Sequence, residues 1–286
     1  MNARPVLRYH GGKWRIAPWV ISFFPEHRVY VEPFGGAGSV LMRKPRSYAE
    51  IWNDLDDEVV NLFRVLRSDR ATELRRMIEL TPYARSEFNT AYEHSPDDLE
   101  RARRLVVRSF MGHGSSGARK HRTGFRSNTN RLGSTPCGDW CSLPASLDTI
   151  IARLRGVIIE QRPFEMIIER NGEPGTLIYC DPPYMFGTRS QKRIGNDLFH
   201  GYAHELDDDA HGRLLDLVLS SRAMIVLSGY RSKLYDQRLA GWRRFETNAR
   251  SDGAHPRVEN IWLSPNCEAG QRSLFEGRKL MTELDP

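Results

Sequence analysis

The sequence predicts an α/β protein with a doubly wound, mostly parallel sheet and an inserted, mostly helical segment. Short apolar runs alternate with stretches of helical periodicity, as is typical of a sheet covered by helices. A glycine-rich turn at residues 34–38 directly follows the first apolar run. A basic, irregular stretch in the middle of the chain interrupts the alternation.

The apolar runs and the periodic segments place the elements along the chain. Strands are expected at residues 29–31, 49–52, 157–160, 176–180, 224–227 and 260–263. Helices are expected at residues 58–66, over much of 68–107, at 147–154 and at 214–219. Ser39 is expected to cap a further helix that starts near Val40. Pro82 and Pro96 should divide the long charged helical region into segments, because proline breaks a helix.

The interruption in the middle predicts a discontinuous domain organisation. Residues 112–142 are rich in Gly, Ser, Thr and Asn and predict a long loop or an irregular hairpin, and long loops in compact domains are usually functional or disordered. We therefore expect a catalytic domain in two parts, residues 1–65 and 156–265. An inserted substrate-recognition domain is expected at residues 66–155, and a peripheral tail at 266–286.

The composition favours a soluble globular protein of 286 residues, 40% of them hydrophobic and 27% charged. Neither a membrane-spanning stretch nor a secretion signal is evident, so we expect a cytoplasmic protein without a membrane partner, and a monomer. The four cysteines are scattered and predict no disulfide framework. Cys137 and Cys141 lack a second ligand pair at zinc-site spacing, so we expect no metal.

The glycine-rich turn predicts a ligand site. In an open α/β sheet, ligands bind beyond the carboxyl ends of the strands, where glycine lets the backbone approach them closely. Gly35, Gly36 and Gly38 lie at such a position. Asp54 follows them at about the interval expected for an acid that binds both hydroxyls of a ribose. A turn that serves only packing remains the alternative.

The most specific motif is Asp181-Pro182-Pro183-Tyr184, directly after the strand expected at residues 176–180. An aromatic amino group is a poor nucleophile, because its lone pair is delocalised into the ring. The Asp181 carboxylate and the Pro182 carbonyl could accept its two hydrogens, and the prolines fix the backbone. Tyr184 offers a flat face on which an extruded base could stack. A methyl donor that is already activated would need neither a metal nor a covalent intermediate, only orientation and electrostatics.

At these residues the chain resembles the Dam-like DNA adenine methyltransferases, from about Leu7 to Pro265. The resemblance rests on Tyr9-His10-Gly11-Gly12-Lys13, Glu32-Pro33-Phe34-Gly35-Gly36-Ala37-Gly38-Ser39, Asn53-Asp54, Asp181-Pro182-Pro183-Tyr184 and Leu227-Ser228-Gly229-Tyr230. It implies a Rossmann-like methyltransferase fold, S-adenosyl-L-methionine as cofactor, double-stranded DNA as partner and methylation of the N6 amino group of a flipped-out adenine. The cofactor-binding residues that it implies are Tyr9, Lys13, Glu32, Phe34, Gly35, Gly36, Gly38, Asp54, Phe164 and Asp181.

One position departs from the family pattern. The family commonly has Asp-Phe before the catalytic strand, with the Asp on the adenine of the cofactor, whereas this chain has Pro163-Phe164. The resemblance still implies that Phe164 packs on that adenine. The polar contact that the missing Asp would make with the adenine is then expected from Glu165 or from a backbone amide.

The basic stretch predicts the DNA-binding surface. The net charge is +6, and residues 101–138 contain eight Arg and one Lys but no Asp or Glu before Asp139. Part of the arginines at residues 101–108 would belong to an ordinary solvated helix face. The acid-free loop at residues 119–131 is the stronger prediction, since Arg and Lys neutralise phosphates and Asn adds polar contacts. Its expected DNA contacts are Arg119, Lys120, Arg122, Phe125, Arg126, Asn128 and Arg131.

Several alternatives remain open on the sequence. The same chemistry could act on the amino group of cytosine, or on RNA. A catalytically inactive DNA-binding protein is a different class, against which the intact Asp181 motif argues. A nicotinamide oxidoreductase is more distant, because Leu41 occupies the position of the third glycine of its motif. Pro136-Cys137 resembles a cytosine-ring nucleophile only superficially. A role in a restriction pair, in a phage or in chromosome maintenance is also open.

Overall fold

The computed structural model describes residues 5–114, 122–130, 134–188, 193–194, 197–198, 204–250 and 256–268. Its strands are β1 (Val29–Glu32), β2 (Ala49–Asn53), β3 (Val157–Glu160), β4 (Thr176–Cys180), β5 (Arg193–Ile194), β6 (Asp197–Leu198), β7 (Met224–Gly229), β8 (Arg243–Arg250) and β9 (Pro256–Leu263). Its α-helices are α1 (Ala17–Ile21), α2 (Asp57–Leu66), α3 (Ala71–Leu80), α4 (Arg85–Thr90), α5 (Asp98–Met111), α6 (Pro136–Cys141), α7 (Leu143–Leu154), α8 (Phe164–Arg170), α9 (Asp208–Ser220) and α10 (Lys233–Arg238).

A seven-stranded mixed sheet forms the centre of the molecule, in the order β3-β2-β1-β4-β7-β9-β8. The five strands from β3 to β7 are parallel, and β9 runs antiparallel to both of its neighbours. The chain winds outward from β1 to β3 and then in the other direction from β4. The switch between β1 and β4 is the position at which open α/β sheets bind ligands. The predicted α/β sheet is thus confirmed.

Both faces of the sheet are covered, because successive side chains of a strand point to opposite faces. In β4, Leu177 and Tyr179 belong to one apolar core, while Ile178 and Cys180 belong to another. The first core also contains residues of α1, α2, α3, α5 and α7. The second contains residues of α8, α9 and α10. The near-continuous burial of β4 and β7 follows from this double cover.

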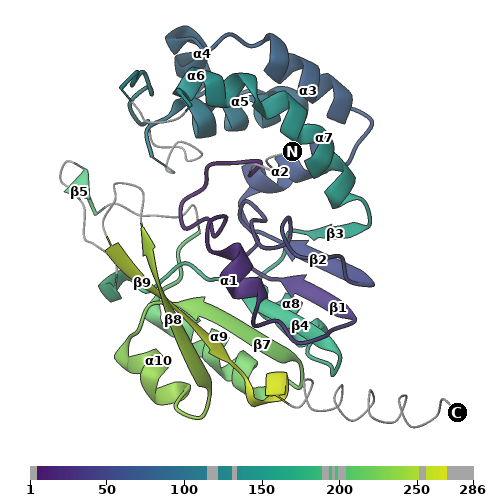
Figure 1. The fold of residues 1–286 in the computed structure, drawn as a ribbon, viewed down its shortest axis with the longest axis vertical. Coiled ribbons are helices and arrows are strands. Elements are labelled where there is room, and N and C mark those ends of the chain that lie inside the picture. The colour runs from purple at the N-terminus through teal and green to yellow at the C-terminus, as the bar shows by residue number, and fades with distance from the viewer. Residues whose placement is uncertain are drawn as a thin grey trace, which may run out of the picture.

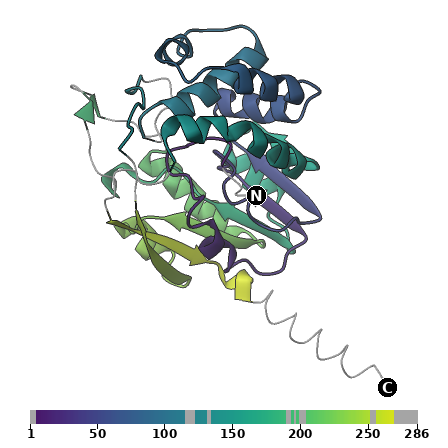
Figure 2. The same cartoon turned by 45° about the horizontal axis from the view of Figure 1, so that its top comes forward.

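Helices α3 to α7 lie together next to α2 and the β3 edge of the sheet (Figures 1 and 2). Helix α5 begins at Asp97, whose carboxylate accepts hydrogen bonds from the amides of Leu99 and Glu100. Pro82 and Pro96 lie between α3 and α4 and between α4 and α5, as expected. The apolar faces of these helices share one continuous core with β1 and β2. The division of the chain into separate domains stays a prediction.

Two expectations about local structure are wrong. No helix starts at Val40: the amides of Met42 and Lys44 bond to the carbonyls of Gly38 and Val40, and the single turn then stops before Pro45. Residues 112–142 are not all loop, because α6 begins at Pro136 behind the capping hydroxyl of Thr135. Six residues are too few for helical periodicity to reveal.

The described residues between Gly112 and α6 agree with an irregular hairpin. Gly112 and Phe125 form an isolated antiparallel bridge. Cys137 and Cys141, on α6, are both free and exposed. Among the described residues, no helix combines the length and the apolarity that crossing a bilayer requires.

Candidate active site

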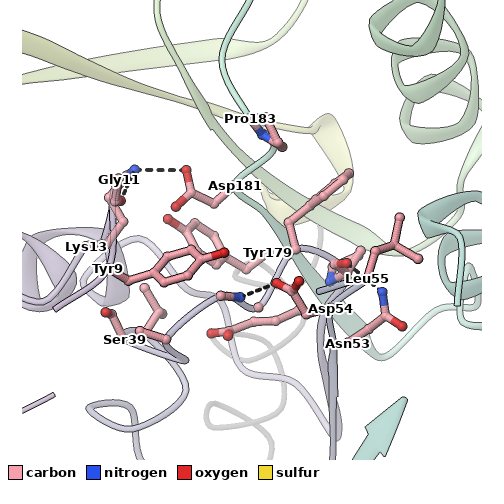
Figure 3. A pocket seen from close by; sticks show the side chains of 18 of the residues that line it. Tyr9, Gly11, Lys13, Ser39, Asn53, Asp54, Leu55, Tyr179, Asp181 and Pro183 are labelled. Carbon is pink, nitrogen blue, oxygen red and sulfur yellow. Dashed lines mark hydrogen bonds and ion pairs between the residues drawn. The ribbon is translucent and has the colours of Figure 1, made fainter. Parts of the chain in front are cut away.

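A pocket opens at the switch between β1 and β4, and most of the predicted site residues line it (Figure 3). The empty space inside it, including space open to solvent, is about 780 Å³. The lining includes Tyr9, Lys13, Glu32, Phe34, Gly35, Gly36, Asp54, Phe164, Asp181 and Pro183. Gly38 is not part of the lining. Pro182 and Tyr184 are buried in the loop beyond β4.

The glycines of the turn are required by the backbone conformation and by packing inside the protein. Gly36 and Gly38 have φ angles of +48° and +62°, which disfavour any residue with a Cβ. A Cβ at Gly35 would lie 2.0 Å from Nε1 of Trp52. Trp52 is fully buried and stacks on Phe63 at a centroid distance of 4.0 Å. Gly35 is therefore required by the tryptophan beneath the turn.

Asp54 holds the turn in place from the end of β2. Its Oδ2 accepts a hydrogen bond from the amide of Gly36 at 2.7 Å, and its Oδ1 accepts one from the amide of Asp56 at 2.8 Å. Burial raises the pKa of Asp54 to about 6, although both amide bonds oppose that shift. A ligand that donates hydrogen bonds to this carboxylate would offset the cost of its burial.

Asn53 joins the loops at the ends of three neighbouring strands. Its Nδ2 donates to the carbonyls of Pro33 and Arg162, at 2.8 Å and 3.0 Å, and its Oδ1 accepts from the amide of Arg162. The side chain is thus fully used inside the protein. The motif Asn53-Asp54 therefore combines a residue that ties the loops together with one that faces the pocket.

Glu32 is a second buried carboxylate in the pocket wall. Its Oε1 accepts hydrogen bonds from the hydroxyl of Tyr30 at 2.6 Å and from the amide of Leu41 at 2.7 Å. Burial raises the pKa of Glu32 to about 7, while these two bonds and Lys44 oppose the rise. Two carboxylates that are costly to ionise therefore line one pocket, which favours a ligand that carries positive charge and hydroxyl donors.

Two aromatic rings form an apolar part of the wall. The rings of Phe34 and Phe164 lie 5.2 Å apart, tilted by 35°. Phe164 begins α8, directly after Pro163, and is 6% exposed. Glu165, which the sequence offered as a replacement for the missing acid, instead pairs with Arg213 on α9 at 3.3 Å. This ion pair holds the carboxylate of Glu165 near the surface, and Glu165 is not part of the pocket lining.

The segment before α1 brings a lysine to the end of β4. Gly11 has a φ angle of +71°, and the amide of Gly12 bonds to the carbonyl of Tyr9, so the chain turns sharply here. Nζ of Lys13 then lies 2.9 Å from Oδ1 of Asp181 and 2.9 Å from the carbonyl of Gly11. Burial raises the pKa of Asp181, and Lys13 opposes the rise most strongly.

Tyr184 follows the two prolines and is 7% exposed. Its hydroxyl donates to Oε2 of Glu259 at 2.7 Å, and its ring packs edge-on against Tyr230 at 4.4 Å. Nζ of Lys13 lies 4.8 Å from the centre of the Tyr184 ring. The tyrosine is thus held on several sides by protein groups.

The predicted DNA contacts fall into three groups. Arg119, Lys120 and Arg131 lie outside the described residues. Arg122 and Asn128 are exposed. Phe125 packs against Tyr83 and Phe88, at 5.2 Å and 5.7 Å, within the helical group.

Arg126, the remaining predicted contact, is buried. It is 6% exposed, and its Nη1 donates to the carbonyl of Phe110 at 2.9 Å. Its amide donates to the carbonyl of Met111, and its carbonyl accepts from the hydroxyl of Tyr83. These bonds anchor the loop on α5, which suits Arg126 to holding the loop in place.

The arginines of α5 pair with acids of the same helix and of other parts of the fold. Arg101 pairs with Asp57, Glu58 and Asp98. Arg103 pairs with Glu87 and Glu100, Arg104 with Glu100, and Arg108 with Glu58. The acid-free run of sequence therefore does not produce an acid-free surface along this helix.

Some lining residues were not predicted from the sequence. Tyr179 reaches the pocket from β4 with its hydroxyl 2.9 Å from Oγ of Ser228, and the alternation along the strand could have revealed it. His204 and Leu206 reach the pocket from the loop before α9. Glu259 is brought to Lys13 and Tyr184 by the antiparallel strand β9, and no local motif marks it.

Comparison with known proteins agrees with this arrangement. The family model described as D12 class N6 adenine-specific DNA methyltransferase matches residues 9–239. The chain is 25% identical over 193 residues to a DNA N-6-adenine-methyltransferase of Escherichia phage P1, covering 63% of this chain and 24% of the phage protein. It is 23% identical over 196 residues to the Type II methyltransferase M1.LlaDCHI of Lactococcus lactis subsp. cremoris, covering 65% of this chain and 67% of that protein. The matched region thus spans about a quarter of one relative and about two thirds of the other.

Proposed function

The chain belongs to the D12 class N6 adenine-specific DNA methyltransferases, and from this premise we propose that it methylates the N6 amino group of adenine in DNA, with S-adenosyl-L-methionine as methyl donor. The observation that carries the proposal is the position of Asp181. Its carboxylate lies at the end of β4 and lines the same pocket as Asp54 and Glu32. An acceptor for an amino group and a site for a cationic, ribose-bearing ligand are thus adjacent.

The pocket fits S-adenosyl-L-methionine by its chemistry. Asp54 would accept hydrogen bonds from the ribose hydroxyls, since each of its oxygens retains a lone pair beside its amide bond. Glu32 would face the positive charge, and Tyr9 and the glycine turn would contact the ligand closely. Phe34 and Phe164 would pack on the adenine ring, an apolar contact that needs no acid at position 163. The bound donor supplies a methyl group already activated by its sulfonium charge.

The residues around Asp181 orient and polarise the target amino group. Asp181 would accept one of its hydrogens and the carbonyl of Pro182 the other, which directs the nitrogen lone pair out of the ring plane. The carboxylate also stabilises the positive charge that grows on the nitrogen during methyl transfer. Lys13 contributes by opposing the effect of burial on the pKa of Asp181, which favours the ionised form of this carboxyl.

The recessed position of Asp181 requires the base to leave the duplex. Its side chain is 17% exposed, and that of Lys13 beside it is 6% exposed. A base that remains stacked and paired could not bring its amino group to this carboxylate. We therefore propose base flipping, with the unstacking cost of a few kcal/mol that it entails.

Double-stranded DNA is the proposed partner, and the loop at residues 119–131 is its proposed contact. Arg122 and Asn128 are exposed. The other predicted cations, at positions 119, 120 and 131, lie in the same stretch of the sequence, outside the described residues. Phe125 and Arg126 would hold the loop on the helical group. The helical segment is thereby proposed to be the recognition part of the molecule. The lactococcal relative is named a Type II methyltransferase, which supports a role in restriction-modification.

The identity of the methylated nucleoside tests the proposal. Unmethylated duplex DNA is incubated with the protein and the donor, digested to nucleosides and separated by mass spectrometry. We expect N6-methyladenine as the new nucleoside. Methylated cytosine would show that the same chemistry acts on another base. Methylation of RNA in preference to DNA would show that RNA is the partner. Absence of any methylated product would favour a DNA-binding protein without activity.

A further inference from the structure

Glu259 lies at the meeting point of three separate parts of the site. It belongs to β9, whose register places Asn260 opposite Gly229 at the end of β7. Glu259 thereby reaches the loop that contains Tyr230. Its Oε1 accepts from the hydroxyl of Tyr230 at 3.2 Å, and its Oε2 accepts from the hydroxyl of Tyr184 at 2.7 Å.

The two tyrosines are held as a pair by this one carboxylate. Their rings are 4.4 Å apart and packed edge to face. Nη1 of Arg257 donates to the hydroxyl of Tyr230 at 3.0 Å. Glu259 is only 12% exposed, so the orientation of Tyr184 depends on a bond that water does not easily replace.

Lys13 lies between two carboxylates. Its Nζ is 2.9 Å from Oδ1 of Asp181 and 3.9 Å from Oε2 of Glu259. In this position it occupies one of the oxygens that the target amino group must reach. Moving a buried ammonium away from Asp181 without another partner would be costly, and Glu259 is close enough to supply that partner.

We propose, on the basis of the function proposed above, that Glu259 is a positioning residue of the methyl transfer. Its carboxylate fixes Tyr184 beside the target base and receives Lys13 from Asp181 when the amino group enters. No proton or covalent bond changes hands at Glu259. Its role is to keep the lysine charge compensated while Oδ1 of Asp181 becomes free to accept a hydrogen bond.

The charged and titratable groups around this cluster define what a substitution at Glu259 should change. The groups around Asp181 are Lys13, Glu259, Tyr184, Tyr179, Glu32 and Cys180. The groups around Glu259 are Tyr184, Tyr230 and Lys13, and Arg257 bonds to the hydroxyl of Tyr230. Glu259 raises the pKa of Asp181 through its negative charge. Removing that charge should therefore lower the pH at which Asp181 ionises.

The test compares Glu259→Gln and Glu259→Asp with the wild-type protein in single-turnover methylation of duplex DNA. Glu246→Gln on β8 is the matched control, because it removes one exposed carboxylate near the same sheet edge. We expect Glu259→Gln to slow methyl transfer about 10- to 100-fold, the scale of a slight misplacement of reacting groups. The affinities for S-adenosyl-L-methionine and for DNA should stay within about twofold.

The pH profile separates a positioning role from a merely structural one. In Glu259→Gln, the acidic limb of the rate profile should move to lower pH, whereas loss of folded protein would lower the rate at every pH. Glu259→Asp keeps the charge and should return the limb toward its wild-type position. If Glu259→Gln fails to fold, Tyr230→Phe replaces it in the test. This change removes only the hydroxyl that donates to Glu259, and it should slow methyl transfer without moving the acidic limb of the rate profile.

The outcomes distinguish this inference from the function on which it rests. An active wild-type protein with a Glu259→Gln variant of equal rate, or with an unmoved acidic limb, would overturn the role of Glu259 alone. An equal loss in Glu246→Gln would do the same. A wild-type protein that methylates neither DNA base would overturn the proposed function together with this inference.

Discussion

Nζ of Lys13 lies 2.9 Å from Oδ1 of Asp181, and this ion pair joins the segment before α1 to the loop after β4. The two residues are 168 positions apart in the sequence. Both are largely buried, so each depends on the other to carry its charge. The contact joins one end of the proposed cofactor pocket to the proposed acceptor of the target amino group.

Asp181→Ala should abolish methyl transfer while leaving the donor and DNA bound. Asp181→Asn is the finer test, because an amide still accepts a hydrogen bond but does not stabilise the positive charge on the attacked nitrogen. We expect a loss of about two to three orders of magnitude in single-turnover rate, as for other preorganised electrostatic contacts. Asp208→Asn, an exposed change at the start of α9, is the control. Near-normal turnover by Asp181→Asn would contradict the proposed chemistry.

Asp54→Ala should weaken binding of S-adenosyl-L-methionine by about 1–3 kcal/mol, the scale of hydrogen bonds to a charged group. The structure adds that the amide of Gly36 loses its acceptor, so the turn should also loosen. Asp54→Asn retains one side-chain acceptor and should lose less affinity. Calorimetric titration measures both, with the exposed Asp57→Asn on α2 as control. Unchanged affinity in a folded Asp54→Ala protein would remove this residue from the site.

Glu32→Gln should have opposite effects on the stability of the protein and on its affinity for the cofactor. The pKa of Glu32 is raised from 4.5 to about 7 by burial, so its contribution to stability is present below about pH 4.5 and is lost as pH rises through 7. At about pH 8 the substitution should therefore stabilise the ligand-free protein, by about 3 kcal/mol. The same change should weaken binding of the cationic donor.

Thermal unfolding and calorimetry at about pH 5 and pH 8 check this prediction. Wild-type affinity for the donor should rise between these values, because the ionised forms of Glu32 and Asp54 bind a cation better. Glu26→Gln, an exposed change, should alter neither quantity. A Glu32→Gln protein that is less stable at the higher pH would show that the carboxylate contributes more by its bonds to Tyr30 and Leu41 than it costs by burial.

Neutralising Arg119, Lys120 and Arg122 together should flatten the dependence of DNA affinity on salt by about two to three units of logarithmic slope. The reason is that binding releases about one counterion for each phosphate that the protein contacts, so each lost contact lowers the number released by about one. Thermal unfolding should change little, because Arg122 is exposed. Neutralising Arg213, Arg222 and Arg238 around α9 removes the same charge far from the helical group and should leave the slope unchanged. An unaltered slope in the loop variant would place the DNA contact elsewhere.

Much of the sheet could be predicted because its strands are buried on both faces and appear as short apolar runs. This holds for β1, β4 and β7 and largely for β2. Strand β3, at the other edge of the sheet, is only partly buried but is still a short apolar run. Strand β8, at the sheet edge, was not predicted, since Arg243–Arg250 is mostly polar and has one exposed side. Only the end of β9 was predicted, because its first half is paired mainly with β8 and carries polar residues.

The sequence by itself determined the order of the motifs, and with it which residues could meet at the ends of β1, β2 and β4. It did so because glycine, proline and aspartate at strand ends have local conformational and chemical roles that need no knowledge of distant contacts. Only the tertiary structure decided that Arg101, Arg103 and Arg108 pair with acids of other elements, that Arg126 is buried, and that Glu259 reaches Lys13 and Tyr184. These facts depend on which side chains fold against one another across long separations, where burial and pairing, rather than local sequence, set the charge that each group presents.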